Sequence, residues 1–172
     1  AEMAAGLMRE PAALRAMARA LMEKSPEILA ANEADMQRGR EGGMPESLLD
    51  RLMLNEARIA GMAEGLEQVA DLPDPVGRVM DEWTRPNGLV IRKVRVPMGV
   101  IGIIYEARPN VTVDAAALAF KAGSAILLRG SSSAYESNAA LVRVMRESLE
   151  KSGVTPDAVC LVEDPSHETV DR

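Results

Sequence analysis

The stretch VPMGVIGIIYEARPNVTVDAAALAFKAGSAILLRG, residues 96–130, decides the fold class. It contains two short, continuous apolar runs, GVIGIIY and SAILLRG, which are typical of parallel strands covered on both faces. The segment between them has helical composition, with Thr112 as a possible cap and Gly123 as its end. A further helical segment, SNAALVRVMRESLEKSG, leads to a third apolar run, DAVCLVED. The pattern predicts an α/β fold with a parallel sheet in the order β-α-β-α-β.

The region upstream of this stretch, residues 1–72, has the apolar spacing of helices. Apolar residues recur three and four positions apart in PAALRAMARALMEK and in NEARIAGMAEGLEQVADL. The segment between them opens with Ser25, a plausible N-cap, and closes on Gly42 and Gly43. We therefore expect N-terminal helices that pack on the sheet.

Residues 73–97 combine turn signals with a basic strand. LPDPVG and RPNG have the Pro, Asn and Gly residues of turns, and GLVIRKVRVP has strand composition with Arg92, Lys93 and Arg95. Such a strand is not buried on both faces. Its charges protect an exposed sheet edge, or another subunit completes that edge.

Composition excludes several classes of partner. The net charge of -6 argues against a nucleic acid or an anionic membrane surface as the main partner. No apolar run approaches the length of a membrane span. One cysteine and one histidine exclude an internal disulfide framework and argue against a structural zinc site, and the cysteine usage fits a reducing cytoplasm.

Polar residues follow the first two apolar runs, where ligands of parallel sheets bind. Glu106, Arg108 and Asn110 follow the first run, and Arg129 opens the polar run RGSSSAYESN after the second. A guanidinium beside hydroxyl groups can hold a phosphate or a ribose. The alternative is that the serines simply cap the next helix.

The two residues that commonly serve as nucleophile and base have ordinary surroundings in the sequence. Cys160 lies in an apolar strand, between Val159 and Leu161, which predicts a buried and inert thiol. His167 lies in the polar segment DPSHET and is expected on the surface.

The same residues resemble the gamma-glutamyl phosphate reductase family of the aldehyde dehydrogenase superfamily. The resemblance rests on YEARPNVTVD, EILAANEADM, LLDRLML, ADLPDPVGRV and LVEDPS, and it covers nearly the whole chain. It implies an aldehyde dehydrogenase-like, three-layer cofactor-binding domain, of which residues 98–172 form the first part. It further implies that the helices of residues 1–72 precede this domain, and that residues 73–97 include a strand used for dimerisation.

The resemblance also implies a reaction. Family members reduce L-glutamyl 5-phosphate to L-glutamate 5-semialdehyde and phosphate with NADPH, through a cysteine thioester, in proline biosynthesis in the cytoplasm. A homodimer or higher homo-oligomer and an association with glutamate 5-kinase are implied as well. Because the family's nucleophilic cysteine lies beyond residue 172, we expect an N-terminal fragment that lacks the catalytic domain and is inactive alone.

A cofactor site is implied at the two strand ends. Arg129 matches the basic position that reaches the adenosine ribose, where it would meet the 2'-phosphate of NADPH. Family members usually have a second glycine where this chain has Ser131. The expected cofactor-binding residues are Tyr105, Glu106, Ala107, Arg129, Gly130, Ser131 and Ser132.

Two further residues are implied in substrate chemistry. Asn110 resembles the superfamily's oxyanion asparagine, although its spacing differs from the common Pro-x-Asn version, and Arg108 is a candidate for the substrate's carboxylate or phosphate. The alternative functions are a stand-alone nucleotide-binding or assembly module and a general aldehyde dehydrogenase. The YEARPNVTVD run departs from the pattern of the latter.

Overall fold

The structure of the chain is a computed structural model that describes residues 10–163, so His167 lies outside the described part. The elements in chain order are α2 (Pro11–Glu23), α3 (Ser25–Glu41), α4 (Glu46–Leu52), α5 (Glu56–Asp71), β1 (Val79–Thr84), β2 (Val90–Val94), β3 (Val100–Ile104), α6 (Pro109–Lys121), β4 (Ala125–Arg129), η1 (Ser132–Ala134), α7 (Tyr135–Lys151), η2 (Pro156–Ala158) and β5 (Val159–Leu161).

A parallel sheet with the strand order β3-β4-β5 confirms the predicted β-α-β-α-β unit. Ile104 pairs with Arg129, and Leu128 pairs with Leu161. Because the strands run in the same direction, the carboxyl ends of β3 and β4 lie side by side at one edge of the sheet.

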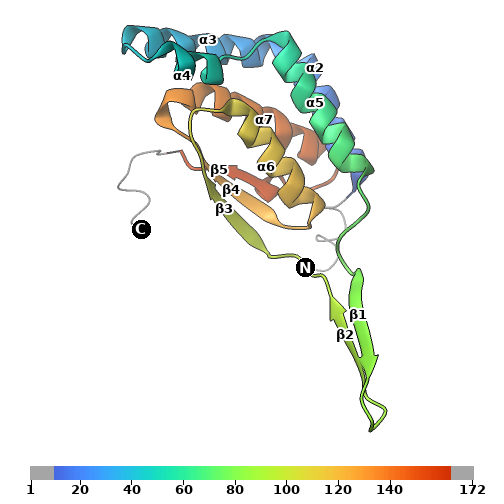
Figure 1. Cartoon of the computed structure of the whole chain (residues 1–172). Coiled ribbons are helices and arrows are strands. Elements are labelled where there is room, and N and C mark those ends of the chain that lie inside the picture. Colours follow the sequence, from blue (N-terminus) through green and yellow to red (C-terminus); the bar gives the residue numbers. More distant parts are fainter. Residues whose placement is uncertain (1–9, 164–172) are drawn as a thin grey trace.

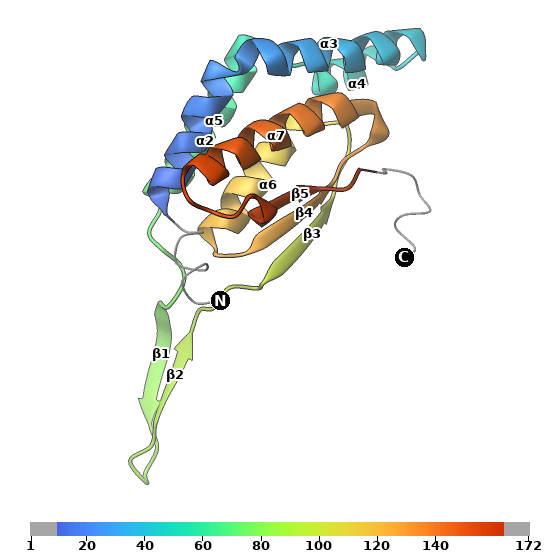
Figure 2. The same ribbon diagram turned by 180° about the vertical axis from the view of Figure 1, so that it is seen from behind.

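The helices form two layers on one face of this sheet (Figures 1 and 2). The helices α6 and α7 lie against the strands, and α2, α3 and α5 pack on the outer side of α6 and α7. A continuous apolar core runs through these layers, with Leu14 of α2, Phe120 of α6 and Leu128 of β4 buried in it. The core therefore joins the N-terminal helices to the sheet.

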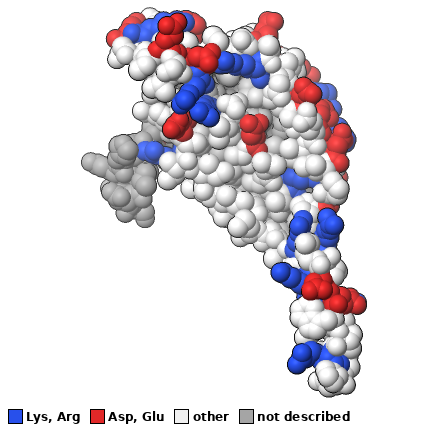
Figure 3. Space-filling view, viewed as in Figure 1, with Lys and Arg blue, Asp and Glu red and all other residues white. Residues whose placement is uncertain are grey.

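The prediction that both faces of the sheet are covered is wrong for the described residues. Val100 is 73% exposed and Ile104 is 63% exposed, because both lie on the face that the described helices leave open. Figure 3 shows that the surface around these strands has few charged side chains. The apolar runs are continuous because both strand faces are apolar, and the helices described here cover only one of them.

Two predicted helix caps are also wrong. Helix α3 already includes Ser25, because Lys24 alone joins it to α2, and the Ser25 side chain makes no capping bond. Helix α6 begins at Pro109, a position at which a backbone N–H would have no partner within the helix, so proline loses no hydrogen bond there. Thr112 therefore lies inside the helix, and it is buried. The predicted glycine ends are confirmed by positive φ angles at Gly43 and Gly123.

Helix α4 and strand β1 were not predicted from the sequence. Strand β1 pairs with β2 in an antiparallel hairpin, so the basic strand finds its partner within the chain. The RPNG segment forms the predicted turn, with Gly88 at a φ of 84°. Figure 1 shows that the hairpin projects from the rest of the molecule, and Trp83 and Val90 on it are exposed.

A buried carboxylate on α3 caps helix α7. Asp35 has no exposed surface, and its Oδ2 accepts hydrogen bonds from the backbone N–H of Ser137 at 2.7 Å and the Ser137 hydroxyl at 2.6 Å. Its Oδ1 accepts from the backbone N–H of Glu136 at 3.3 Å and also pairs with Arg38. A carboxylate at this position satisfies backbone donors of the first helical turn and complements the positive end of the helix dipole.

Asn32, one turn earlier on α3, extends this contact to the segment between α4 and α5. Its amide donates to the carbonyl of Leu52 at 2.9 Å and to the Ser137 hydroxyl at 3.0 Å. Its side-chain oxygen accepts from the N–H of Leu54 at 2.7 Å. These bonds fix α3, the end of α4 and the start of α7 relative to one another.

Candidate functional site

The structure brings the two sets of expected cofactor-binding residues together. The N–H of Tyr105, just after β3, donates to the carbonyl of Arg129 at the end of β4 over 3.1 Å. Residues 105–107 and 129–132 therefore lie next to each other at the carboxyl edge of the sheet. This is the edge at which open parallel sheets bind their ligands.

The Tyr105 hydroxyl points into the protein. It lies 2.7 Å from the Thr112 hydroxyl, which donates to the side-chain oxygen of Asn138 at 2.9 Å. Burial raises the pKa of Tyr105, and the hydrogen bond with Thr112 offsets part of that rise. The phenol therefore stays neutral and holds the end of β3 against α6 and α7.

Close packing explains why residue 130 is glycine. A Cβ atom on Gly130 would lie 2.2 Å from the side-chain nitrogen of Asn138 and 3.2 Å from the Tyr105 ring. No side chain fits there without moving the network that holds the strand ends. Gly130 thus sets the path of the loop after β4 through packing.

The serines after β4 differ in their hydrogen bonds and in their exposure. The Ser131 hydroxyl accepts from the N–H of Ser133 at 3.3 Å, so for this serine the structure shows the helix-capping alternative. Ser132 is exposed. Ser132 and Ser133 line a cavity of about 280 Å³ together with Arg38 and three other residues at the end of α3 and just after it.

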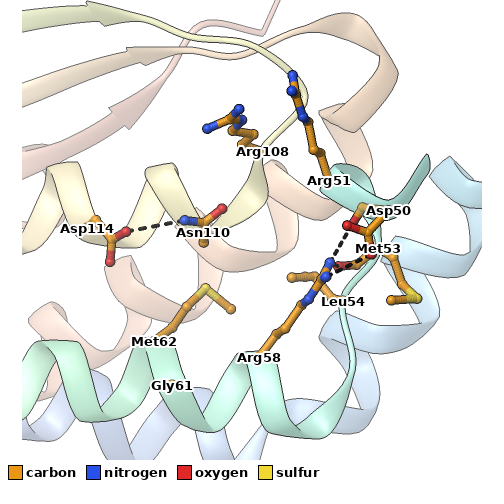
Figure 4. Close-up of a pocket in the computed structure, with 10 residues that line it drawn as sticks. All are labelled: Asp50, Arg51, Met53, Leu54, Arg58, Gly61, Met62, Arg108, Asn110 and Asp114. Atoms are coloured by element: carbon orange, nitrogen blue, oxygen red, sulfur yellow. Dashed lines mark hydrogen bonds and ion pairs between the residues drawn. The ribbon is translucent and has the colours of Figure 1, made fainter. Parts of the chain in front are cut away.

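A second cavity, of about 530 Å³, lies between α4, α5 and α6 beside the end of β3 (Figure 4). Both residues implied in substrate chemistry, Arg108 and Asn110, line it. The other lining residues are Asp50, Arg51, Met53, Leu54, Arg58, Gly61, Met62 and Asp114.

The three arginines of this cavity differ in their partners. The Arg58 guanidinium already has partners, since it donates hydrogen bonds to the side chain and the backbone carbonyl of Asp50. Arg51 lies 3.6 Å from the carboxylate of Glu106 and so links α4 to the residues after β3. The Arg108 guanidinium makes no hydrogen bond or ion pair with any side chain among residues 10–163, and Figure 4 shows it at the same end of the cavity as Arg51.

An amide and a carboxylate extend from α6 into the same cavity. The Asn110 side-chain nitrogen donates to Oδ2 of Asp114, one turn further along the helix, over 3.4 Å (Figure 4). Burial raises the pKa of Asp114, and the Asn110 hydrogen bond offsets part of that rise. No cationic side chain pairs with Asp114 in the described part of the chain.

Three residues of this cavity were not predicted from the sequence: Arg51, Gly61 and Asp114. In the sequence each is an ordinary position in a helical segment, where charged residues usually form a solvated face. They become recognisable only when α4 and α5 pack beside α6, because Arg51 and Asp114 lie far apart in the chain.

Cys160 is half-buried, which corrects the prediction of a fully buried thiol. It lies on β5, the edge strand of the described sheet, and contacts the carbonyl of Asp157 at 3.5 Å and the Arg146 guanidinium at 3.6 Å. It lines a different cavity, beside α7, and not the one that contains Arg108 and Asn110.

Residues 10–163 contain no group of three or more histidine, cysteine or acidic side chains placed to hold a metal ion. In the same range no helix is long and apolar enough to cross a bilayer.

Comparison with known proteins shows a close similarity to one group of enzymes. The chain is 54% identical to the gamma-glutamyl phosphate reductase of Anoxybacillus flavithermus over 160 residues, which is 93% of this chain and 39% of that protein. The chain thus spans about two fifths of the length of the curated relatives it matches. No protein-family model matches it.

Solved structures show the same similarity. The gamma-glutamyl phosphate reductase of Thermotoga maritima superposes with a TM-score of 0.91 at 45% identity, over 98% of this chain and 42% of that one. A propionaldehyde dehydrogenase from Clostridium phytofermentans superposes with a TM-score of 0.63 at 12% identity, over 96% of this chain and 34% of that one. The latter likeness shows an aldehyde dehydrogenase-like fold and nothing more.

The raised pKa of Asp114 predicts how stability depends on pH. An acid whose pKa is higher in the folded state favours folding when protonated, and this contribution is lost as the pH rises from 3.8, its ordinary value, through the raised pKa. Asp114→Asn should therefore be more stable than wild type at pH 7, with a difference that vanishes below pH 3.8. Urea unfolding of both proteins between pH 3 and pH 7 measures the difference in their free energies of unfolding.

The matched control is Asp157→Asn, which changes a carboxylate that is 78% exposed and does not line the cavity of Asp114. It should show no gain in stability at pH 7. A loss of stability in Asp114→Asn at pH 7 would contradict the assignment of a desolvated carboxylate.

Proposed function

We propose that this chain, a relative of the gamma-glutamyl phosphate reductases along 93% of its length, forms the cofactor-binding part of such an enzyme. The reaction is the NADPH-dependent reduction of L-glutamyl 5-phosphate to L-glutamate 5-semialdehyde and phosphate in proline biosynthesis. The observation that carries the proposal is the cavity lined by Arg108, Asn110 and Arg51, which lies directly beside the carboxyl ends of the sheet.

The residues at the strand ends fit a nicotinamide cofactor. Arg129 is half-buried at the end of β4, and the exposed Ser132 follows it on a loop fixed by the packing of Gly130. A guanidinium and a hydroxyl in this position can hold a phosphorylated ribose. When bound, the cofactor supplies the hydride for the reduction.

The chain's own residues would orient the acyl phosphate. Arg108 and Arg51 carry the positive charge at the cavity end next to the strands and would hold the phosphate group. Asn110 carries the amide that would donate to the oxygen of the reacting carbonyl as negative charge develops there. In this proposal the thiolate nucleophile comes from the part of the relatives' length that this chain does not span.

The exposed hairpin supports the proposal of a homo-oligomer. Trp83 is 43% exposed and Val90 is 48% exposed on a ribbon that contacts little else in the described chain. A two-stranded hairpin is at best marginally stable alone, so pairing with a second copy of the chain would stabilise it.

The hairpin assignment predicts a change in assembly. Trp83→Asp should shift the complete gene product toward monomer in sedimentation velocity, because it places a charge in the apolar contact. Met22→Asp, a change at a similarly exposed apolar residue on α2, should leave the distribution unchanged. A monomeric wild type would contradict the assignment.

The proposed reaction predicts the effect of removing the Asn110 amide. In the complete gene product, Asn110→Ala should lower kcat for phosphate- and NADP-dependent oxidation of glutamate semialdehyde by about 10²–10³-fold, as for the loss of one oxyanion donor. Gln68→Ala, on the exposed face of α5, is the control and should leave kcat unchanged. The 172-residue chain alone should be inactive, and turnover by it would contradict the assignment of the nucleophile.

The preference for NADPH predicts a selective effect at Arg129. Arg129→Ala should weaken NADPH binding by about 1.5–3 kcal/mol, the range for a hydrogen bond to a charged group, and should weaken NADH binding far less. Cofactor titration by fluorescence measures both, with the surface variant Arg143→Ala as control. Equal losses for the two cofactors would place Arg129 at the shared ribose or in a structural role.

A further inference from the structure

Asp114 is a carboxylate in the substrate cavity that lacks a cationic partner. It accepts a 3.4 Å hydrogen bond from Asn110, and no lysine or arginine among residues 10–163 pairs with it. The arginines that line the same cavity do not reach it: Arg58 is held by Asp50, and Arg51 pairs with Glu106. Figure 4 shows Asp114 at the opposite end of the cavity from Arg51 and Arg108.

The helix facing Asp114 has glycines where the two helices approach each other. A Cβ atom on Gly61 of α5 would meet no atom within 4 Å, so packing does not require glycine there. Glycine inside a helix is less favourable than alanine by about 0.8–1 kcal/mol, which makes an unpacked Gly61 a cost to the fold. One turn on, a Cβ atom on Gly65 would lie 3.8 Å from Oδ1 of Asp114. Gly61 thus lines the same cavity as Asp114 without placing a side chain in it, and Gly65 lies next to the carboxylate.

The polar groups along the start of α6 follow a definite order. From the strand end inward they are the cationic Arg108, the amide of Asn110 and the carboxylate of Asp114. Six residues of helix correspond to a rise of about 9 Å. A glutamyl phosphate presents groups in the same order: an anionic phosphate, a reacting carbonyl and, at the far end of a short carbon chain, an α-carbon that carries an ammonium group together with a carboxylate.

We propose that Asp114 determines specificity for an amino-acid substrate by binding its α-ammonium group in the recess that Gly61 leaves open. The inference rests on the proposed function and assigns one more group of the same site. An ammonium donating to a carboxylate is a charge-assisted hydrogen bond, among the strongest in proteins. The bound ammonium would also supply the positive charge that Asp114 lacks in the described chain.

The test compares two substrates in the complete gene product. Glutarate semialdehyde has the same reacting end as glutamate semialdehyde and lacks the amino group. Asp114→Asn should lower kcat/KM for glutamate semialdehyde by about 10–150-fold, the factor that corresponds to the loss of a hydrogen bond to a charged group. It should lower kcat/KM for glutarate semialdehyde by a much smaller factor, because that substrate has no ammonium group to lose a partner, and Asp157→Asn should affect neither substrate. Equal loss with both substrates would overturn the assignment and leave Asp114 a structural role.

A second pair of variants tests the recess itself. Gly61→Leu places a side chain in the cavity that Asp114 also lines, and it should raise KM for glutamate semialdehyde while leaving KM for the cofactor unchanged. Glu64→Leu places the same side chain on the exposed face of the same helix and should change neither value. If Gly61→Leu has no effect on the KM of glutamate semialdehyde, the recess does not hold the substrate.

Equilibrium binding separates this inference from the proposed reaction. Calorimetry on the complete gene product should show tighter binding of L-glutamate than of glutarate, and Asp114→Asn should remove the difference. If the protein shows this preference but does not turn over glutamate semialdehyde, the result supports the ammonium site and contradicts the proposed reaction. A wild type that binds both ligands equally would overturn the recess, whatever its activity.

Discussion

The arrangement of the molecule depends on a buried carboxylate that joins two parts of the chain. Asp35 of α3 accepts two backbone N–H bonds and a hydroxyl bond at the start of α7, and Asn32 extends the contact to the end of α4. A buried charge is costly unless its hydrogen-bonding capacity is satisfied, so this contact tolerates little displacement. Because α7 directly follows the loop of residues 131–134, the same contact fixes the loop after β4.

The one-sided covering of the sheet determines where a site can form. Since α6 and α7 cover one face and the N-terminal helices pack on them, α5 comes to lie beside α6. Helices α4, α5 and α6 and the segment after α4 enclose the cavity that contains Arg108, Asn110 and Asp114. The strand ends that would hold the cofactor adjoin this cavity through the Arg51–Glu106 ion pair. A substrate and a cofactor could therefore meet at the edge of one sheet.

Within the site, several groups named from the sequence make contacts inside the protein. The hydroxyls of Tyr105 and Ser131 are used in internal hydrogen bonds, and Gly130 is required by its contact with Asn138. These residues fix the shape of the strand ends. Arg108 has no side-chain or charged partner in the described chain, and a ligand could bind it without breaking an existing contact.

The sequence by itself determined the three parallel strands, most of the helices and the likeness to the reductases, because apolar periodicity and the YEARPNVTVD run are local properties of the chain. It could not decide between a cap and a buried network for Thr112, or between a ligand contact and a helix cap for Ser131. The Thr112 network depends on Tyr105 and Asn138, which come from other elements, whereas the Ser131 cap is a local contact with Ser133. Only the tertiary structure placed Arg51 and Gly61 in one cavity with Asp114, since α4 and α5 reach α6 through packing, and no short-range pattern encodes that contact.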